Sequence, residues 1–431
     1  MNERPLLDEL SWRGLLHLSS EGLADRLSSG PVSAYIGFDA SATSLHVGHL
    51  LQVFLLTHLQ RAGGRPVIVI GGATGMIGDP SGKSSERNLL DDATIAANSE
   101  ALRGQLERFL DFSPGPTQPL MVNNRDWLEP MSVLDFLRDI GKHFTVPYML
   151  AKDSVQARLS AGMSFTEFSY QTLQAADFLH LHRDEGVDMQ MGGADQWGNI
   201  TAGLELIRRV EGHGEVDEDG ATEPTAFGLC SPLLLTRSGQ KMGKSERGAV
   251  FLDGALTSPW EFYQYWINDD DELVIDHLRW LTLKDAVEID AIAAEHASRP
   301  DARHAQRALA HDLTARIHGR GTADQQVRMS EAVFSGDVDD PDVLDGLFGA
   351  VGGFEFGPEA DDWTALDVAA AAGGASRGEA RRLVTQGGFR INGEQLTDPA
   401  AAVPDLIAGR YWWVALGKKR RLVGRRRDGA A

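Results

Sequence analysis

The sequence predicts a multidomain protein of the α/β class that begins with a doubly wound parallel sheet. Two β-rich runs, at 32–40 and 65–75, flank a segment at 45–63 whose apolar residues recur at helical spacing. This strand–helix–strand order is typical of sheets that bind ligands beyond the carboxyl ends of their strands. Helical spacing dominates residues 258–334, and a basic helix with two short strands follows residue 376. We therefore expect an α/β domain, an α-helical domain and a small α+β domain.

The remaining segments connect these elements. "DFSPGPTQ" (111–118) predicts a loop, and "PLMVNN" (119–124) predicts another strand. The acidic, glycine-bearing residues 211–224 indicate an exposed excursion, and residues 335–362, rich in Gly and Asp, indicate a linker with at most a short helix. Near the C-terminus, Asn392-Gly393 predicts a tight turn between two strands.

Composition narrows the class of protein. With 42% hydrophobic and 24% charged residues among 431, the chain is an ordinary globular one of more than one domain. Its first residues lack the pattern of a signal or transit peptide, and no segment reaches the roughly 18 apolar residues of a membrane span. Cys230 is the only cysteine, which excludes an intramolecular disulfide and multi-cysteine metal sites. We expect a soluble, cytoplasmic protein with no membrane partner.

The charge is unevenly distributed. The net charge is −21, yet from Ser376 onward 12 Lys or Arg stand against 5 Asp or Glu, a balance of +7 that leaves −28 on the first 375 residues. A basic C-terminal region in an otherwise acidic chain is typical of a small module that binds a polyanion.

The stretch "SLHVGHLLQ" (44–52) places His46 and His49 around Gly48, where the first predicted helix begins. Zinc binding is disfavoured, because the glutamate of HExxH is missing and the chain has no cysteine cluster. Two ordinary polar residues in a first helical turn would be the plainer interpretation. However, a helix N-terminus attracts phosphate, and Gly48 would let a nucleotide approach the backbone.

The segment "GGATGMIGDPSGKSSER" (71–87) has neither the Walker nor the dinucleotide spacing of glycines. Asp79, Lys83 and Arg87 follow its glycines closely, which a mere glycine-rich loop does not explain.

The segment "SGQKMGKSERG" (238–248) holds two lysines, Lys241 and Lys244, between glycines and serines. It could bring two ammonium groups to a polyphosphate. A solvated loop is an equally good interpretation when the segment is taken alone.

The helical segment "FTEFSYQTLQAADFLHL" carries Tyr170, Gln174 and Asp177 at i, i+4 and i+7, so the three side chains share one face. By itself this stripe could simply face water. Among the other motifs, it can be the wall of a pocket.

The segment "MQMGGADQWGNI" (189–200) follows a predicted strand. Gly193 allows a ligand to approach closely, and Asp195 could bind ribose hydroxyls, as acidic residues do in dinucleotide folds. The alternative is that Asp195 caps the helix that follows.

Together these motifs resemble a known family. HxGH at a first strand–helix turn with KMxKS about 200 residues later is similar to class I aminoacyl-tRNA synthetases. "GFDASATSLHVGHL", "GGATGMIGDPSGK", "GGADQWGNI" and "KMGKS" look specifically like bacterial tyrosyl-tRNA synthetases. The resemblance covers nearly the whole chain. It implies a Rossmann-like doubly wound catalytic domain with a connecting insertion (1–235), a mobile KMGKS loop (236–250), an α-helical anticodon-side domain (251–334), a linker (335–362) and an S4-like RNA-binding domain (363–431).

The resemblance implies a two-step reaction. L-tyrosine and ATP, with Mg²⁺, would give tyrosyl-adenylate and pyrophosphate, and tyrosine would pass to the 3′-terminal adenosine of tRNA(Tyr). The attacking carboxylate is already ionised, so positioning and charge stabilisation suffice without a general base. It also implies a homodimer and no tightly bound, protein-ligated metal.

Residue roles follow from the same resemblance. The catalytic set comprises His46, His49, Lys83, Arg87, Lys241 and Lys244. The tyrosine-binding set comprises Tyr35 and Asp177 at the phenolic hydroxyl, Asp79, Tyr170 and Gln174 at the ammonium group, and Gln190. The ATP-binding set comprises Gly37, Asp39, His46, Gly48, His49, Gly193, Asp195, Gln196, Lys241, Met242 and Lys244. The RNA-binding set comprises Arg208, Arg209, Arg381, Arg382, Arg390, Lys418, Lys419, Arg420 and Arg421.

The chain departs from the family pattern at Ala40, where proline is common, and has Gly243 inside KMxKS; we expect activity to survive both.

A tryptophanyl enzyme shares the fold and both signatures, but Asp177 and the S4-like end favour tyrosine. A nucleotidyltransferase with its own HxGH would lack the lysine loop. A non-catalytic RNA-binding paralogue would be expected to have lost signature residues.

Overall fold

The structure is a computed structural model that describes residues 4–40, 42–79, 91–152, 155–156, 162–212, 224–245, 248–336, 338–374, 376–417 and 420–427, with the backbone only at 244–245. The chain divides into two compact units. Unit 1 comprises Met1–Thr257 with Asn268–Leu309, and unit 2 comprises Ser258–Ile267 with Ala310–Ala431.

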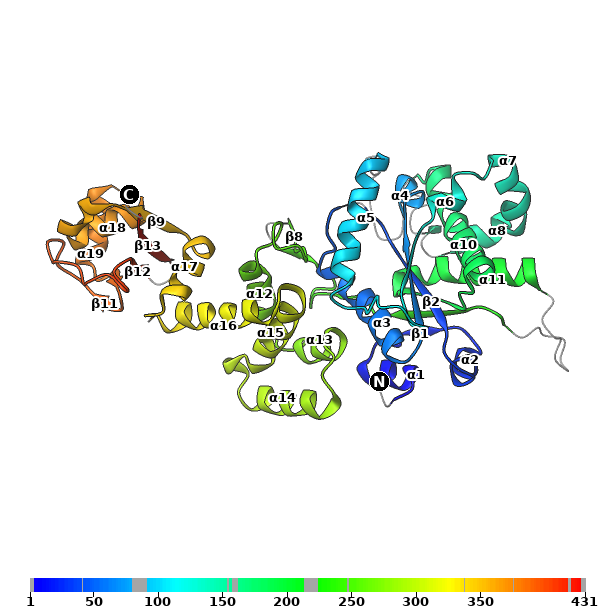
Figure 1. The fold of residues 1–431 in the computed structure, drawn as a ribbon, viewed down its shortest axis with the longest axis horizontal. Helices are drawn as coiled ribbons and strands as arrows, with labels where there is room; N and C mark the ends of the chain where they lie inside the picture. The colour runs from blue at the N-terminus through cyan, green and yellow to red at the C-terminus, as the bar shows by residue number, and fades with distance from the viewer. Residues whose placement is uncertain are drawn as a thin grey trace. The chain divides into compact units, whose positions relative to one another are not determined.

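Unit 1 is built on a six-stranded sheet of order β1-β6-β5-β2-β3-β4 (Figure 1). Its strands are β1 (Leu18–Ser19), β2 (Ser33–Phe38), β3 (Arg65–Ile70), β4 (Leu120–Asn123), β5 (Met189–Gly193) and β6 (Phe227–Ser231). All neighbours pair in parallel except β1, which is antiparallel to β6. The strand order reverses between β2 and β5, where the diverging connections leave a crevice at the carboxyl ends. The predicted doubly wound α/β fold is confirmed.

Helices cover both faces of this sheet. On one face, Tyr35, Val67 and Val69 pack with Phe178 and Leu206 of α10 (Phe165–Glu185) and α11 (Trp197–Glu211). Helix α3 (Leu50–Arg61) packs on β2, β3 and β5 from the other face, with α1 (Leu6–Arg13) and α13 (Val274–Leu281) against it. Burial on both faces explains why β3 reads as the continuous apolar run "VIVI" and not as an alternating one.

Unit 1 contains further described elements. They are α2 (Leu23–Ser28), η1 (Val47–His49), α4 (Thr74–Ile77), α5 (Asp92–Leu106), α6 (Arg125–Leu128), α7 (Val133–Asp135), η2 (Phe136–Ile140), η3 (Gly141–His143), α8 (Val146–Leu150), η4 (Ala194–Gln196), β7 (Lys244–Ser245), β8 (Gly248–Ala249), α14 (Ala286–Ser298) and η5 (Pro300–Ala302).

Helix α10 has clear local signals at both ends. Ser164 and Glu167 form a reciprocal capping box, and Gly186 ends the helix in the left-handed conformation at φ 64°. Local sequence signals therefore define both ends of this helix, and its packing against the sheet and α11 determines which face meets the cavity.

Unit 2 contains a five-stranded sheet of order β11-β10-β12-β13-β9. Its strands are β9 (Gly353–Phe356), β10 (Phe389–Ile391), β11 (Glu394–Gln395), β12 (Tyr411–Leu416) and β13 (Arg420–Arg426), and its helices are α12 (Pro259–Ile267), α16 (Arg320–Ser335), α17 (Pro341–Ala350), η6 (Pro358–Asp362), α18 (Ala365–Gly373) and α19 (Arg377–Thr385). The predicted basic helix and hairpin are α19 and β10–β11, and their turn residues Asn392 and Gly393 have φ 48° and 82°, as a type I′ turn requires.

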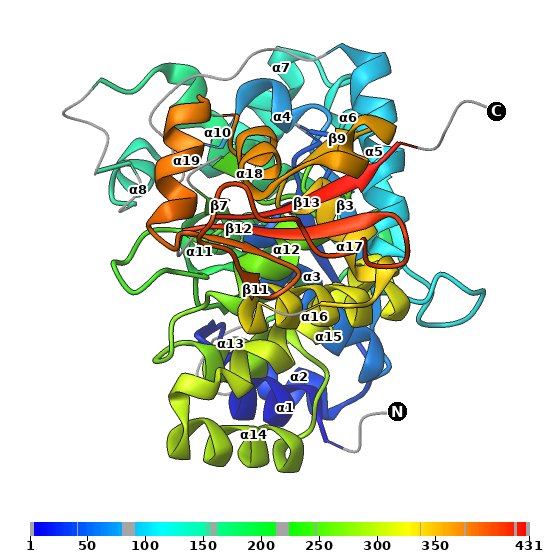
Figure 2. The ribbon, with the colours of Figure 1, turned by 90° about the vertical axis from the view of Figure 1, so that its left-hand side faces the viewer.

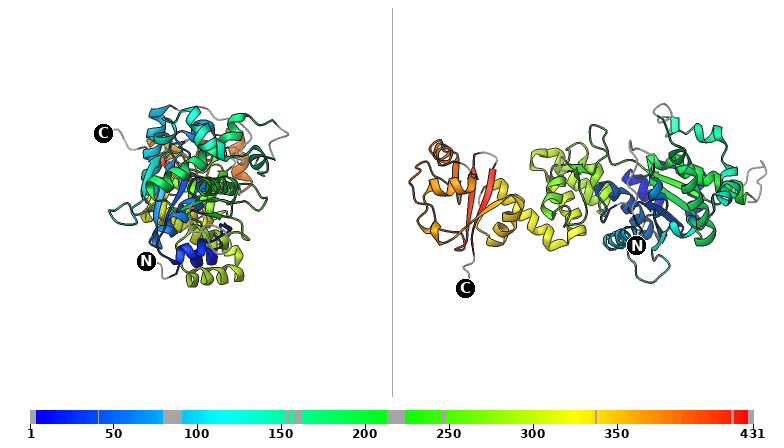
Figure 3. Two further views of the ribbon diagram at one scale, coloured as in Figure 1. Left: turned by 90° about the vertical axis from the view of Figure 1, so that its right-hand side faces the viewer. Right: turned by 90° about the horizontal axis from the view of Figure 1, so that it is seen from above.

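Apolar side chains fill both faces of this second sheet. Phe389, Val414 and neighbours pack under α18 and α19, whereas Trp413 and Val423 pack with Leu344 of α17. Figure 2 shows β12 and β13 side by side, and Figure 3 shows the sheet between α17 and the α18–α19 pair.

The segment 335–362 differs from the expected linker. Asp340 caps α17 with Pro341 in its first turn, and β9 pairs in parallel with β13. The capping signal is local and readable, but the pairing of β9 depends on residues about 70 positions away, which composition cannot reveal.

The segment 258–334, expected as one helical domain, divides between the units, since 268–309 clusters with unit 1. Helix α15 (His304–His318) begins in unit 1 and ends in unit 2. Most of the expected excursion at 211–224 lies outside the described residues. No helix in the described ranges is long and apolar enough to cross a membrane.

Candidate active site

The crevice at the strand switch holds a cavity of about 740 Å³. The carboxyl ends of β2 and β5, the start of α3 and one face of α10 surround it. The predicted residues that line it are Tyr35, Gly37, Asp39, His46, Gly48, His49, Asp79, Tyr170, Gln174, Asp177, Gln190, Gly193, Asp195, Gln196, Lys241 and Met242. Residues almost 200 positions apart are thus brought to one cavity.

The HxGH and KMGKS segments touch through their backbones. Val250 joins them, because its N–H donates to Gly243 and its carbonyl accepts from Val47, each at 2.9 Å. A Cβ at Gly48 would lie 3.1 Å from the Met242 carbonyl oxygen, and one at Gly243 would lie 2.9 Å from the Gly48 nitrogen. Glycine at both positions is therefore required for this approach, and Gly243, at φ 113°, also adopts a conformation that other residues avoid.

The two histidines fix each other at the start of α3. The backbone N–H of His46 donates to Nδ1 of His49 at 3.1 Å, and that of Gly48 donates to Nδ1 of His46 at 3.0 Å. The rings stack with centroids 3.9 Å apart. Because both Nδ1 atoms accept, each neutral ring carries its proton on Nε2 and has an N–H to donate from that atom.

Asp195 pairs with Lys241 instead of capping a helix. The ammonium nitrogen lies 2.6 Å from Asp195 Oδ2, and no side-chain cap is found at the start of η4 or α11, both of which lie in the described ranges. The capping interpretation of Asp195 is therefore wrong in this structure.

The buried end of the cavity centres on Asp177, which is 4% exposed. Asn124 Nδ2 donates to its Oδ2 at 2.9 Å and Trp127 Nε1 to its Oδ1 at 2.8 Å. Burial raises the pKa of Asp177 to about 7, while these two hydrogen bonds oppose the rise. The stripe of α10 faces this cavity and not water.

Tyr35 faces the same end of the cavity. Its hydroxyl is buried and has no hydrogen-bond partner among the described residues. Burial, and then the nearby Asp177, raise its pKa well above the ordinary value. Burying a hydroxyl without a hydrogen-bond partner costs free energy. The buried Tyr35 hydroxyl therefore indicates that a ligand group supplies its partner.

A chain of amides connects the middle of the cavity. Gln196 donates to Asp79 Oδ2 at 2.8 Å and accepts from Gln174 at 3.2 Å, and Asn199 donates to Gln174 Oε1 at 3.0 Å. Asp79 and Gln174, both predicted, are thus coupled through Gln196.

Some predicted residues are not described in full. Lys83, Arg87, Lys418 and Lys419 lie outside the described residues, and only the backbone of Lys244 is described.

Sequence reasoning missed three residues of the buried end: Thr74, Asn124 and Trp127. Asn124 follows strand β4, and the rule that ligands gather at carboxyl ends of parallel strands could have flagged it. Trp127 carries no comparable signal, since its role depends on α6 folding onto α10.

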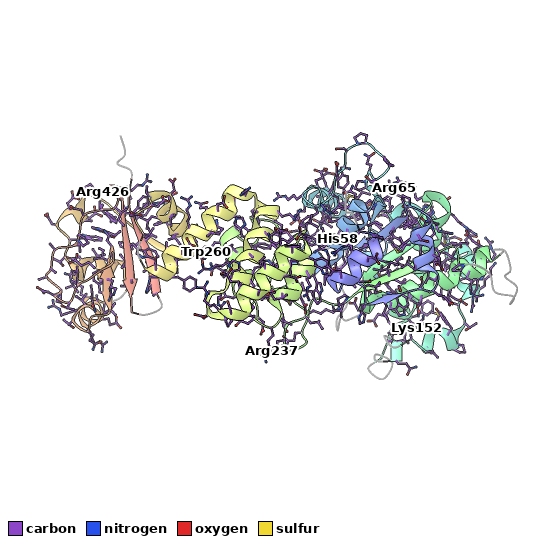
Figure 4. The ribbon with its side chains drawn as sticks, turned by 90° about the horizontal axis from the view of Figure 1, so that it is seen from below. His58, Arg65, Lys152, Arg237, Trp260 and Arg426 are labelled. Atoms are coloured by element: carbon purple, nitrogen blue, oxygen red, sulfur yellow. The ribbon has the colours of Figure 1, made fainter. Side chains whose placement is uncertain are left out.

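The predicted RNA-binding arginines fall into two groups. Arg208 and Arg209 on α11 both pair with Glu205, at 2.8 and 2.5 Å. In unit 2, the exposed Arg381 and Arg382 lie on α19, the exposed Arg390 lies on β10, and Arg420 and Arg421 begin β13. Neighbouring Arg425 and Arg426 (Figure 4) pair instead with acids of their own unit.

A doubly wound sheet whose crevice joins an HxGH helix start to a KMxKS loop defines a class I synthetase fold. The family model "tRNA synthetases class I (W and Y)" matches residues 27–335, and the S4 domain model matches residues 366–404. The chain belongs to this class I family.

Within that family, its relatives are tyrosine–tRNA ligases. It is 49% identical to that of Anaeromyxobacter dehalogenans, over 96% of this chain and 97% of the relative. It is 44% identical to that of Geobacillus stearothermophilus, over 96% and 98%. The solved structure of a C-terminally truncated Aspergillus nidulans mitochondrial tyrosyl-tRNA synthetase is similar with a TM-score of 0.67 and 29% identity, over 77% of this chain and 94% of that one. The family predicted from the motifs is confirmed.

Proposed function

We propose that this chain joins tyrosine to tRNA(Tyr) in two steps. The tyrosine carboxylate attacks the α-phosphorus of ATP and pyrophosphate leaves; the 3′-terminal adenosine hydroxyl of tRNA then attacks the adenylate carbonyl and AMP leaves. One observation carries the proposal: a single cavity is lined at one end by His46, His49 and Lys241 and at the other by Tyr35 and Asp177.

The first step needs charge stabilisation and no base. An ionised carboxylate is the nucleophile, so the site has only to align it and stabilise the phosphate oxygens. The Nε2–H groups of His46 and His49 would donate to those oxygens. Lys241, and by resemblance Lys244, Lys83 and Arg87, would meet the pyrophosphate, while Asp195 would hold the ribose.

Selection of tyrosine would occur at Asp177 and Tyr35. The phenolic hydroxyl would donate to the Asp177 carboxylate and accept from the Tyr35 hydroxyl, which satisfies the buried group that now lacks a partner among the described residues. Phenylalanine would leave the Tyr35 hydroxyl without a partner, and the Asp177 carboxylate would receive no hydrogen bond from the ligand. The discrimination known for tyrosyl-tRNA synthetases on this basis is about 10⁵.

Mg²⁺ would enter with the phosphates of ATP. Among the described residues no group of three or more His, Cys, Asp or Glu could hold a metal by itself. The ion would neutralise phosphate charge, and the chain's own contribution is the pair of histidines and the lysines.

We further propose a homodimer. Helices α7, η2 and α8 and the start of α10 expose large apolar side chains: Val133 (74%), Leu134 (78%), Leu137 (51%), Val146 (60%) and Phe165 (76%). We infer that these side chains belong to the surface that a second copy of the chain covers, because large apolar side chains are seldom left exposed in such numbers without a partner.

Because tRNA and ATP are its proposed substrates, we propose that the protein acts in the cytoplasm.

The basic residues of unit 2 would bind tRNA through phosphates, which gives affinity and register more than sequence specificity. Arg208 and Arg209 would contact the acceptor stem, in competition with Glu205.

The decisive experiment is amino-acid-dependent ATP–pyrophosphate exchange with tyrosine, phenylalanine and tryptophan in parallel. We expect exchange with tyrosine alone; no exchange with tyrosine, or preference for tryptophan, would overturn the proposal. His49→Ala should lower the single-turnover rate of adenylate formation by roughly 10²–10³, with tyrosine binding little changed.

A further inference from the structure

Trp127 is held between two residues of one helix. Its Nε1–H donates to Asp177 Oδ1 at 2.8 Å, and its indole stacks on the His180 imidazole with centroids 4.4 Å apart and planes inclined by 23°. His180 Nδ1 lies 2.8 Å from Asp184 Oδ2. Asp177, His180 and Asp184 lie at i, i+3 and i+7 along α10 and therefore on the same side of this helix.

The two donors to Asp177 are supported differently. The side chain of Asn124 is fixed by three hydrogen bonds, because it also donates to Thr74 Oγ1 at 2.8 Å and accepts from the Ala73 N–H at 2.9 Å. Trp127 has one polar atom, which is already used, and it stands on the four-residue helix α6. Its ring plane is therefore set by packing: the indole stacks on the flat ring of His180 and also packs against the apolar core of unit 1.

We propose that His180 is a positioning residue for tyrosine selection: by stacking on Trp127 it aims the indole N–H at Asp177 and fixes the carboxylate that meets the phenolic hydroxyl. An N–H donor is directional, so a tilt of the indole weakens or removes this bond. The inference rests on the proposed function. Because phenylalanine has no hydroxyl to present, disturbing His180 affects tyrosine selectively.

The test compares His180→Ala with His180→Phe, which keeps a flat ring. In pyrophosphate exchange we expect His180→Ala to lower kcat/KM for tyrosine by about tenfold, mainly through KM, because misplacement outside the reacting groups can cost up to about 10²-fold. For phenylalanine, kcat/KM should change by less than about twofold, and His180→Phe should restore the value for tyrosine. The control is His182→Ala on the same helix, since His182 contacts the Val187 carbonyl and Glu211, and its two kcat/KM values should stay unchanged.

A double-mutant cycle with Trp127→Phe separates positioning from general damage. Trp127→Phe removes the N–H and should cause the same tyrosine-specific loss, and adding His180→Ala to it should cause little more. Equal losses for both amino acids, failure of His180→Phe to restore tyrosine use, or an unchanged His180→Ala enzyme would each overturn the inference. If the wild-type protein shows no tyrosine-dependent exchange, it is the proposed function that fails.

Discussion

The ammonium group of Lys241 lies 2.6 Å from the carboxylate of Asp195. Lys241 belongs to the KMGKS segment and Asp195 to the turn after β5, so this ion pair joins two distant segments that both line the cavity. In the proposed reaction both groups act on ATP, Asp195 at the ribose and Lys241 at the pyrophosphate. ATP must therefore open the pair, and each partner holds the other in place until then.

Lys241→Ala should remove a cation that acts on the leaving pyrophosphate. Losing one such transition-state donor costs about 2.7–4 kcal/mol, so the rate of adenylate formation should fall by roughly 10²–10³. Single-turnover kinetics with saturating tyrosine and ATP measures this rate. The control is Arg237→Ala (Figure 4), because Arg237 is 65% exposed and pairs with Glu272 outside the cavity. A comparable decrease in the control variant would contradict the assignment.

The stability of the ligand-free protein should depend on the ionisation of Asp177. Its pKa is about 7 in the fold against a usual value of 3.8, so the fold binds the proton more tightly than the unfolded chain does. The stabilisation is fully present below about pH 4 and is lost as the pH rises through about 7. Relative to Asp177→Asn, the wild type should therefore lose stability between pH 5 and 8 in denaturant titrations. A constant difference between the two proteins over this range would contradict the raised pKa.

Tyrosine binding should show the opposite pH trend. A phenolic hydroxyl donates best to an ionised carboxylate, so the KM for tyrosine should fall as the pH rises from 6 to 8. Asp177→Asn should abolish this trend and lower the discrimination against phenylalanine. The measurement is the pH dependence of kcat/KM for both amino acids, and a trend that survives in the variant would point to another group.

Arg13 should be a large contributor to the stability of unit 1. Its side chain is 3% exposed; it pairs with Glu9 at 2.7 Å and donates to the carbonyl oxygens of Arg279, Thr282 and Lys284 at 2.7, 3.0 and 2.9 Å. Arg13→Met leaves three carbonyls without their donor, and it leaves the buried Glu9 carboxylate with only the half-exposed Arg4 at 4.0 Å. We expect a decrease of about 3–5 kcal/mol in the free energy of unfolding.

Chemical denaturation tests this value, with Arg103→Ala as the control. Arg103 pairs with Glu107 at the surface, with side chains 46% and 49% exposed, and pairs of that kind contribute little. The double variant Arg13→Met with Glu9→Leu should be destabilised less than Arg13→Met alone, since no buried charge is then left unpaired. An equal destabilisation would refute the buried ion pair as the cause.

Arg381 and Arg382 should bind tRNA phosphates. Both are exposed on α19, and no ion pair of theirs is found in the described part of unit 2. Replacing both with alanine should weaken tRNA binding and reduce the slope of log K against log salt by roughly 0.9 for each duplex phosphate that the variant no longer neutralises. Arg425→Ala is the control, because Arg425 already pairs with Glu355 and Asp345 at 2.8 and 3.2 Å. If the salt slope changed only in Arg425→Ala, the tRNA phosphates would be bound by Arg425 and not by Arg381 and Arg382.

Local features of the fold can be predicted from neighbouring residues in the chain. The β-branched runs and the turn at Asn392-Gly393 are decided by neighbouring residues, and each appears in the structure where the pattern predicts it. The HxGH and KMGKS motifs could be interpreted because their order and spacing resemble those of class I synthetases, and phosphate binding is what that resemblance implies.

Contacts between distant residues become visible only once the chain is folded. The approach of Gly48 to Gly243, the pairing of β9 with β13, and the donors Asn124 and Trp127 on Asp177 all join segments that lie tens to hundreds of positions apart in the chain. Such contacts depend on the order of strands in the sheet and on which helix faces which, and no local periodicity encodes either. The sequence therefore shows which reactive groups are present. Tertiary packing determines which residues surround each group, how deeply it is buried and how its pKa shifts.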